Sequence, residues 1–383
     1  MNPLYAALPT TVFTRMSALA AEHGAVNLGQ GFPDFGWPEE VVARAAEALS
    51  GSNQYAPMPG LATLRSAVAD RYRAEQGLDL VPEQVTVTSG ATEALAAALF
   101  ALITPGDEVL MFQPLYDAYL PLVLRAGGIP RYVRLAPPGW RITAEALDEA
   151  FTPRTRLVLF NNPHNPSARM FDAEELAHLA RACVARDAIV LSDEVWEEVT
   201  FDGRRHIPLA SLPGMRERTV KVGSAGKIFS LTGWKVGWAV APAPLLSPLT
   251  KAHQFLTFST PPNLQAAVAW GLGMGAAYFD EMRARFAEAR DFLADGLRQA
   301  GFALLASEGT YFLSLDLAAS GIALGDEAFC ERAVREAGVA AIPVSSFYAE
   351  APVTNVVRLC FAKRRDTLEA GIERLAAARR LLA

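Results

Sequence analysis

Short runs rich in β-branched residues alternate with helical stretches of about ten to fifteen residues through the middle of the chain. Parallel strands covered on both faces read as continuous apolar runs, and a helix usually connects one strand to the next. The alternation therefore predicts an α/β fold with a mostly parallel sheet between two layers of helices. The predicted strands are 84–88, 108–112, 131–135, 156–160, 188–192, 219–222 and 236–241.

The pattern changes after the proline-rich stretch 242–262. A long amphipathic helix is predicted over 278–300, followed by short strands at 302–305, 311–315 and 356–361 and helices at 326–337 and 366–381. A chain of 383 residues has room for two domains. We expect a large domain at 38–262 and a smaller α/β domain made of 1–37 and 263–383.

Composition excludes several classes of partner. The net charge of −6 argues against nucleic acid or an anionic membrane as the main partner. Three widely spaced cysteines and five scattered histidines predict neither a disulfide framework nor a metal site. Because the first residues lack the features of a signal peptide and no apolar run is long enough to cross a bilayer, we expect a cytoplasmic protein.

Polar side chains follow several of the predicted strands. In open α/β sheets the ligand lies beyond the carboxyl ends of the strands, so residues far apart in sequence meet in one crevice there. The groups predicted to converge are the Ser89-Gly-Ala-Thr92 turn, Tyr116, Asn161, Asn165, Asp193 and the Ser224-Ala-Gly-Lys227 turn.

Two of these turns have more than one interpretation when taken alone. Lys227 becomes an amine nucleophile if burial or a nearby cation lowers its pKa, and Lys235 follows eight residues later. The Ser-x-x-Lys spacing also occurs in acyl-transfer enzymes, and most lysines are simply solvated. The turn from Ser89 to Glu93 is equally open, because it suits either a phosphate or an ordinary capped helix.

Six motifs follow one another along the chain: Asn27-Leu-Gly-Gln-Gly-Phe-Pro-Asp-Phe35, Asn53-Gln-Tyr55, Asn161-Asn-Pro-His-Asn-Pro166, Ser192-Asp-Glu-Val195, the segment from Ser224 to Trp238, and Arg358-Leu-Cys-Phe-Ala-Lys363. Taken together, they resemble the class I/II aminotransferases of fold type I, which use pyridoxal phosphate. The likeness covers nearly the whole chain and is greatest to the kynurenine/glutamine/methionine aminotransferase group. It implies a large domain with a mostly parallel seven-stranded sheet and a smaller α/β C-terminal domain.

The resemblance implies a role for each cofactor-binding residue. Lys227 would hold the cofactor as a Schiff base and then move a proton, and Asp193 would pair with the pyridine nitrogen. Asn165 would bind the cofactor's 3′-oxygen, and Tyr116 would stack on the ring, with Leu115 as the competing residue. The phosphate would be held by the backbone of Ala91 and Thr92, by Ser224 and Lys235, and by Tyr55 of a second subunit in a homodimer.

The same resemblance implies a substrate site. Arg358 would bind the substrate's α-carboxylate through two parallel hydrogen bonds, helped by Asn161 and the backbone of Gly31. Phe13, Phe258 and Tyr311 would line an apolar side-chain pocket. Such a pocket carries no second arginine for a dicarboxylate, so a neutral amino acid is the expected donor.

One position departs from the family pattern. Relatives commonly carry a tyrosine three residues after the aspartate, where it donates a hydrogen bond to the cofactor's 3′-oxygen, but this chain has Trp196 there. An indole N–H is a donor only and reaches differently, so the role of Trp196 is open. Lys235, where many class I enzymes carry arginine, favours the kynurenine/glutamine/methionine group.

The expected function is transfer of an amino group from methionine, glutamine, an aromatic amino acid or kynurenine to a 2-oxo acid by a ping-pong mechanism. One alternative is transamination of N-succinyl-diaminopimelate, since bacterial enzymes of that activity share many of these motifs. Another is β-elimination from cysteine S-conjugates as a side activity. A non-catalytic ligand sensor, like the aminotransferase-like half of some transcription regulators, fits poorly because the chain has no basic N-terminal DNA-binding domain.

Overall fold

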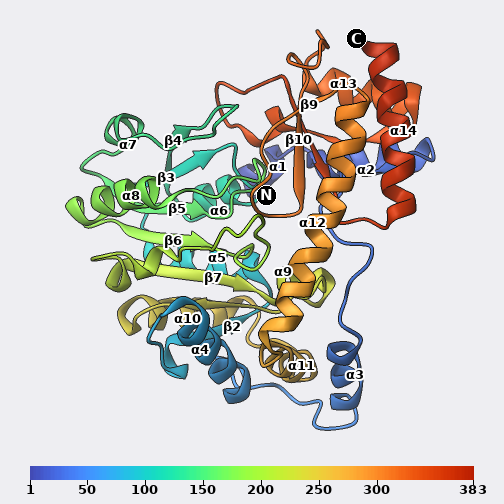
Figure 1. Ribbon diagram of the computed structural model, residues 1–383. Coiled ribbons are helices and arrows are strands. Elements are labelled where there is room, and N and C mark those ends of the chain that lie inside the picture. The colour runs from blue at the N-terminus through green and yellow to red at the C-terminus, as the bar shows by residue number, and fades with distance from the viewer.

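A seven-stranded sheet forms the centre of the computed structural model, which describes residues 1–383 (Figure 1). Its strand order is β2-β8-β7-β6-β5-β3-β4, and only β8 runs antiparallel to its neighbours. The predicted fold class and all seven predicted strands are confirmed. The strands are β2 (Val85–Thr88), β3 (Glu108–Gln113), β4 (Ile129–Arg134), β5 (Thr155–Asn161), β6 (Ile189–Asp193), β7 (Thr219–Ser224) and β8 (Gly237–Val240).

Alternate residues of the central strands pack into separate cores on the two faces of the sheet. On β3, Val109 and Met111 join the core under α5 (Ala91–Leu102), whereas Leu110 and Phe112 join the core under α8 (Ala173–Ala185). Helix α10 (Ala243–Leu256) packs on α5. The other helices around the sheet are α3 (Glu39–Ala48), α4 (Ala62–Gln76), α6 (Tyr119–Arg125), α7 (Ala144–Ala150), α9 (Ala225–Ile228) and α11 (Pro262–Leu272).

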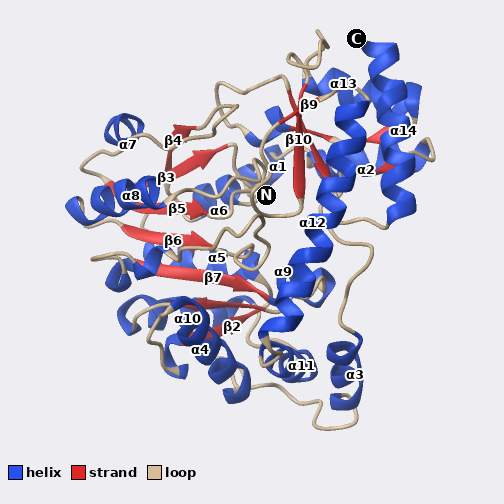
Figure 2. Ribbon diagram, viewed as in Figure 1, coloured by secondary structure: helices blue, strands red, loops and turns tan.

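A second, smaller group of elements holds a four-stranded antiparallel sheet (Figure 2). Its strand order is β12 (Ile342–Pro343), β13 (Val356–Cys360), β10 (Phe312–Asp316) and β9 (Ala303–Leu304). Strand β1 (Val26–Asn27) pairs in parallel with β11 (Val339–Ala340), so an N-terminal segment joins the C-terminal part of the chain here. The helices of this group are α1 (Pro3–Ala7), α2 (Val12–Glu22), α12 (Ala276–Gln299), α13 (Asp326–Arg332) and α14 (Arg365–Leu382).

The division into domains at residue 262 stays a prediction. Helix α11 begins at this boundary and packs against α3 and α4 beside the large sheet. Helix α12 then runs from α11 to the smaller group, where it packs against α14 (Figure 1).

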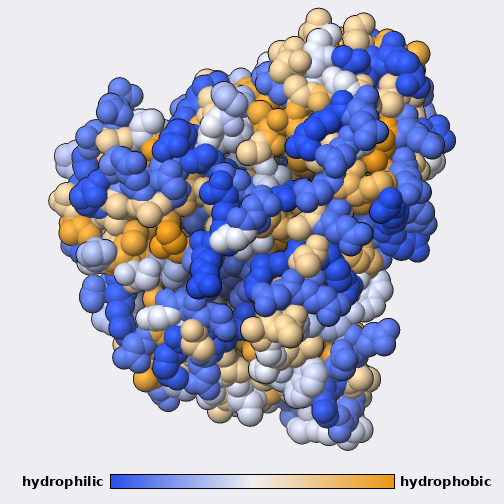
Figure 3. All heavy atoms as spheres, viewed as in Figure 1, coloured by the Kyte–Doolittle hydropathy of each residue, from blue (hydrophilic) through white to orange (hydrophobic).

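The surface seen in Figure 3 is mostly hydrophilic, with apolar side chains in small separate groups. No helix is long and apolar enough to cross a membrane.

One expected boundary is wrong in a way that bears on function. The sequence predicts a turn from Ser89 to Glu93, but α5 already begins at Ala91. Alanine and threonine fit either a turn or a first helical turn, so composition could not decide. As a result, the backbone N–H groups of Ala91 and Thr92 belong to the first turn of a helix, whose N–H groups have no partner within the helix.

Candidate active site

A cavity of about 220 Å³ lies at the carboxyl ends of the parallel strands. It is lined by residues from the ends of β5, β6 and β7 and by the start of α5. The structure therefore brings together the side chains that the strand-end rule selected. The predicted site residues in its wall are Ala91, Thr92, Tyr116, Asn161, Asn165, Asp193, Ser224, Lys227 and Lys235.

One end of the cavity gathers hydrogen-bond donors. Gly90 caps α5 with a φ of 77°, a conformation that favours glycine, and Lys235 Nζ lies 3.1 Å from where a Gly90 Cβ would sit. The first-turn N–H groups of Ala91 and Thr92, the Ser224 hydroxyl and the Lys235 ammonium thus line the same cavity. A helix N-terminus with an added cation is a site for an anion such as phosphate.

A carboxylate lies at another point of the cavity wall. Asp193 ends β6, and its Oδ2 accepts a 2.6 Å hydrogen bond from the hydroxyl of Tyr119. Burial raises the pKa of Asp193 to about 6, although the bond from Tyr119 opposes this rise. Tyr119 was missed by sequence reasoning, because it begins an apolar helix that reads as core. A cation beside Asp193 would compensate its charge.

Lys227 lies in the short helix α9, directly after β7. Its Nζ donates a 3.2 Å hydrogen bond to the hydroxyl of Tyr311, which itself donates to the carbonyl of Gly31 at 2.8 Å. Loss of water around the amine lowers the pKa of Lys227 to about 8, and this effect exceeds the opposing influence of Asp193. An amine with this pKa has a substantial neutral fraction near neutral pH, as a nucleophile requires.

Arg358, on β13, is 1% exposed and forms no ion pair within the chain. Its Nη1 donates to Asn165 Oδ1 at 2.9 Å and its Nη2 to the carbonyl of Gly29 at 3.2 Å, while its buried Nε has no partner. Burial lowers the pKa of Arg358 to about 10, which still leaves it charged at neutral pH. A buried cation without an anion is costly, so this position is suited to binding one.

Aromatic rings and backbone also surround Arg358, and the Asp117 carboxylate is near enough to favour its charged form. Its guanidinium carbon lies 3.9 Å from the ring centroid of Phe312 and 5.2 Å from that of Phe13. The backbone of Gly31 also comes close to Arg358, because a Cβ at Gly31 would lie 3.7 Å from Arg358 Nη2. The structure thus places the predicted residues Phe13 and Gly31 beside Arg358, and Asn165 links this group to the cavity.

Asn161 already has partners for its side-chain amide. Its Nδ2 donates to the carbonyl of Asp193 at 2.8 Å, and its Oδ1 accepts from the backbone N–H of Asn165 at 2.8 Å. Within the chain, Asn161 therefore holds the ends of β5 and β6 together and orients Asn165. Tyr116, rather than its neighbour Leu115, lines the cavity, which favours tyrosine over leucine as the stacking residue.

Two predicted site residues, Tyr55 and Phe258, belong neither to the cavity wall nor to the group around Arg358. Tyr55 is 83% exposed and Phe258 is 40% exposed, and their rings meet edge to face at 5.3 Å. Neither lines the cavity within this chain. Tyr55 was expected to act on the site of a second subunit, and its exposure leaves it available for such a contact.

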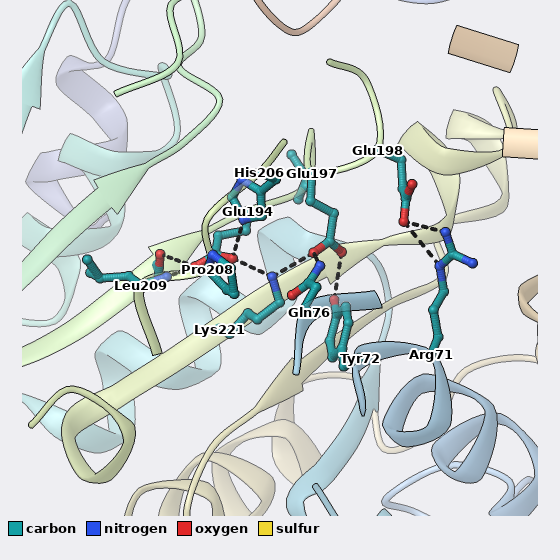
Figure 4. Close-up of polar contacts among 12 residues, drawn as sticks. Arg71, Tyr72, Gln76, Glu194, Glu197, Glu198, His206, Pro208, Leu209 and Lys221 are labelled. Carbon is teal, nitrogen blue, oxygen red and sulfur yellow. Dashed lines mark hydrogen bonds and ion pairs between the residues drawn. The ribbon is translucent and has the colours of Figure 1, made fainter. Parts of the chain in front are cut away.

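A buried ionic cluster that begins at Glu194, the residue after Asp193, was not foreseen from the sequence (Figure 4). Lys221 Nζ on β7 contacts Glu194 and lies 2.6 Å from Glu197 Oε2, and all three side chains are 1% exposed. His206 Nε2 lies 2.7 Å from Glu194, and Tyr72 donates to Glu197 at 2.7 Å. Glu194, Glu197 and His206 are close enough to share a metal ion, but the Lys221 ammonium already compensates the two carboxylates.

These features define an α/β enzyme whose site holds an amine, a carboxylate, an anion cradle and a buried arginine. Residues 23–375 match the sequence family described as aminotransferase class I and II. The chain therefore belongs to the class I and II aminotransferases, and it is an enzyme of the transaminase type with a fold-type I architecture.

Several curated relatives match over almost the full length. A probable N-succinyldiaminopimelate aminotransferase of Mycobacterium tuberculosis is 46% identical, with 96% of this chain and 95% of the relative covered. The methionine aminotransferase of Escherichia coli is 43% identical, with 96% of both chains covered. Kynurenine–oxoglutarate transaminase 1 of Mus musculus is 36% identical over 96% of this chain and 94% of its own.

Solved structures agree with the fold. The N-succinyldiaminopimelate aminotransferase structure from M. tuberculosis superposes with a TM-score of 0.93, covering 96% of this chain and 97% of the other. A structure from E. coli described as having a methionine aminotransferase function gives the same TM-score, with 97% of both chains covered. The resemblance inferred from the motifs is thus confirmed at the level of family, fold and transaminase activity.

Proposed function

We propose that this aminotransferase uses pyridoxal 5′-phosphate, held in the cavity beside Lys227. The donor set fits the group, because an anion cradle, a carboxylate for a pyridine nitrogen, an aromatic ring and an amine line one 220 Å³ space. One observation carries the proposal: the anion cradle formed by Lys235, Ser224 and the α5 N-terminus lines the same cavity as Lys227. When bound, the group acts as an electron sink that stabilises negative charge at the substrate's Cα.

The chain's own residues then have distinct tasks. Lys227 would hold the cofactor covalently and, as a free amine, would carry the proton of the substrate's Cα. Asp193, oriented by Tyr119, would pair with the pyridine nitrogen and keep it protonated. Asn165 would bind the 3′-oxygen, and Tyr116 would cover the ring face. The Ala91 and Thr92 amides, Ser224 and Lys235 would hold the phosphate.

Arg358 is proposed to bind the α-carboxylate of the amino acid, because it is buried, charged and in no ion pair within the chain. The only cations that line the cavity are Lys227 and Lys235, and both already have a role. A second carboxylate on the substrate side chain therefore finds no cationic partner there. This favours a neutral donor such as methionine, glutamine, an aromatic amino acid or kynurenine over a dicarboxylate.

N-succinyl-diaminopimelate is the second candidate donor, favoured by the 46% identity to a relative of that name. A panel of donors with 2-oxo acid acceptors separates the two proposals. We expect keto acid from the neutral donors, and turnover of the succinylated donor alone would overturn this preference in favour of the second candidate. Pyruvate released from a cysteine S-conjugate in the same panel would reveal β-elimination as a side activity.

Replacing Arg358 with lysine is expected to lower kcat/KM by about 10–100-fold, mainly through KM. A lysine ammonium keeps the charge but cannot make two parallel hydrogen bonds to a carboxylate, and a bond to a charged group is worth about 1.5–3 kcal/mol. Steady-state kinetics with the best donor measures the change. The control is Arg365→Lys, whose side chain is 63% exposed and pairs with Glu369. A kcat/KM within twofold of the parent for Arg358→Lys would contradict the assignment.

We further propose a cytoplasmic homodimer in which Tyr55 of one subunit reaches the phosphate site of the other. The three cysteines are free and buried, which suits a reducing compartment. Exposed aromatic side chains support an interface: Phe258, whose ring meets Tyr55, is 40% exposed, and Phe255, three residues earlier, is 85% exposed.

Tyr55→Phe is expected to weaken pyridoxal phosphate binding about tenfold while leaving the dimer intact, because it removes one hydrogen bond to a charged group. Cofactor titration measures the affinity, and sedimentation reports a mass of twice 41.2 kDa. Tyr5→Phe, at another exposed tyrosine, serves as the control. A monomeric parent protein, or an unchanged cofactor affinity in Tyr55→Phe, would argue against a shared site.

A further inference from the structure

Trp196 lies three residues after Asp193 and is buried, with 2% of its surface exposed. It forms part of the wall of the active-site cavity. Lys227 Nζ lies 4.6 Å from the centroid of its ring, and Tyr311 meets the same ring edge-on at 4.4 Å with an interplanar angle of 89°. Phe312 approaches it at 5.5 Å. The indole thus touches one functional lysine and two aromatic neighbours.

Each of these neighbours contacts a group assigned to the reaction. The Tyr311 hydroxyl accepts the hydrogen bond from Lys227 Nζ and donates to the carbonyl of Gly31. The ring of Phe312 lies 3.9 Å from the guanidinium carbon of Arg358. Trp196 therefore contacts both Tyr311, which bonds to the amine of Lys227, and Phe312, which packs on the guanidinium of Arg358. Lys227 and Arg358 themselves lie on different elements of the fold.

We propose that Trp196 is a positioning residue: its ring face favours the ammonium form of Lys227, and its contact with Tyr311 keeps that phenol on Lys227 Nζ. The proposal rests on the proposed function of Lys227 as the reacting amine. A cation over an indole ring is stabilised by the ring's quadrupole, most of all where water is excluded. An aliphatic side chain of similar size would fill the same space without this effect.

Other charged groups also act on Lys227 and have to be considered together with the indole. Asp193 and the Cys360 thiol favour its charged form, whereas Arg358 and Lys235 oppose it. All four remain in place when only Trp196 is replaced. Burial is the largest influence on the pKa of Lys227, and it changes when the large indole is replaced. The contribution of the ring is therefore read from the difference between phenylalanine and methionine at position 196, which are of similar size.

The test measures the pKa of Lys227 in the full chain freed of cofactor. Competitive acetylation across a pH series, read residue by residue by mass spectrometry, gives the pKa of Lys227, with the exposed Lys251 as an internal reference. Relative to the parent, Trp196→Met is expected to lower the pKa of Lys227 by about one unit, whereas Trp196→Phe lowers it by less than half that amount. If Trp196→Met does not fold, as judged by thermal unfolding, Trp196→Leu replaces it.

An unchanged or higher pKa of Lys227 in the aliphatic variant would overturn the proposal, and so would equal shifts in the aliphatic and phenylalanine variants. A purely space-filling role would affect thermal stability without this distinction between aromatic and aliphatic residues. The labelling requires no cofactor. A chain that fails to bind pyridoxal phosphate would therefore contradict the proposed function and leave the pKa comparison to be judged by itself.

Discussion

Lys227→Ala is expected to lower kcat by about 10²–10⁴-fold, the range that a positioned proton-transfer group contributes. The amine is the basic group that lies at the end of β7 with a pKa of about 8, facing Asp193 across the cavity. Under the proposed function, its loss would leave the Cα proton without a carrier and the cofactor without a covalent anchor. Single-turnover kinetics with saturating pyridoxal phosphate measures the loss.

Lys251→Ala is the matched control, because Lys251 is exposed and forms no ion pair. We expect its kcat to equal that of the parent. Both variants should unfold at nearly the same temperature as the parent protein. A Lys227→Ala variant that keeps a tenth or more of the parent kcat would mean that another group carries the proton.

Lys221→Met is expected to destabilise the fold by about 3–5 kcal/mol, the cost of removing one partner of a buried ion pair. The ammonium lies between Glu194 and Glu197, and all three side chains are 1% exposed. Methionine fills the space but leaves two buried carboxylates without the ammonium that compensates them. Urea unfolding would show a lower midpoint at an unchanged slope.

The control is Lys251→Met, which changes the same residue types on the surface and should alter stability by less than about 0.5 kcal/mol.

The cluster also predicts how the fold responds to acid. Burial alone would raise the pKa of Glu194, but Lys221 and His206 lower it to about 2. The stability that ionised Glu194 contributes is therefore fully present above pH 4.3, about the pKa of glutamate in an unfolded chain. It is lost as the pH falls toward 2. Equal stability of Lys221→Met and the parent would contradict this account.

The sequence-based prediction succeeded where local pattern determines the structure. The apolar runs define the strands of the large sheet, and the strand-end rule then places Asp193 and Lys227 at one crevice. Residue type and order are sufficient for this step, because every parallel strand delivers its C-terminal residue to the same edge.

The parts that could not be predicted depend on pairing between distant residues. Tyr119 reads as the start of an apolar helix, and only the fold shows its hydroxyl on Asp193. Lys221 reads as one polar residue in a strand, yet it is buried against Glu194 and Glu197. The position of Tyr311 on Lys227 likewise brings together residues separated by more than eighty positions.

Covalent trapping tests the central claim most directly. The full chain is incubated with pyridoxal 5′-phosphate, reduced with borohydride, digested and mapped by mass spectrometry. We predict a yellow protein before reduction and one phosphopyridoxyl group per chain, attached to Lys227. A colourless protein, or a label on Lys235, Lys221 or scattered surface lysines in place of Lys227, would contradict the account.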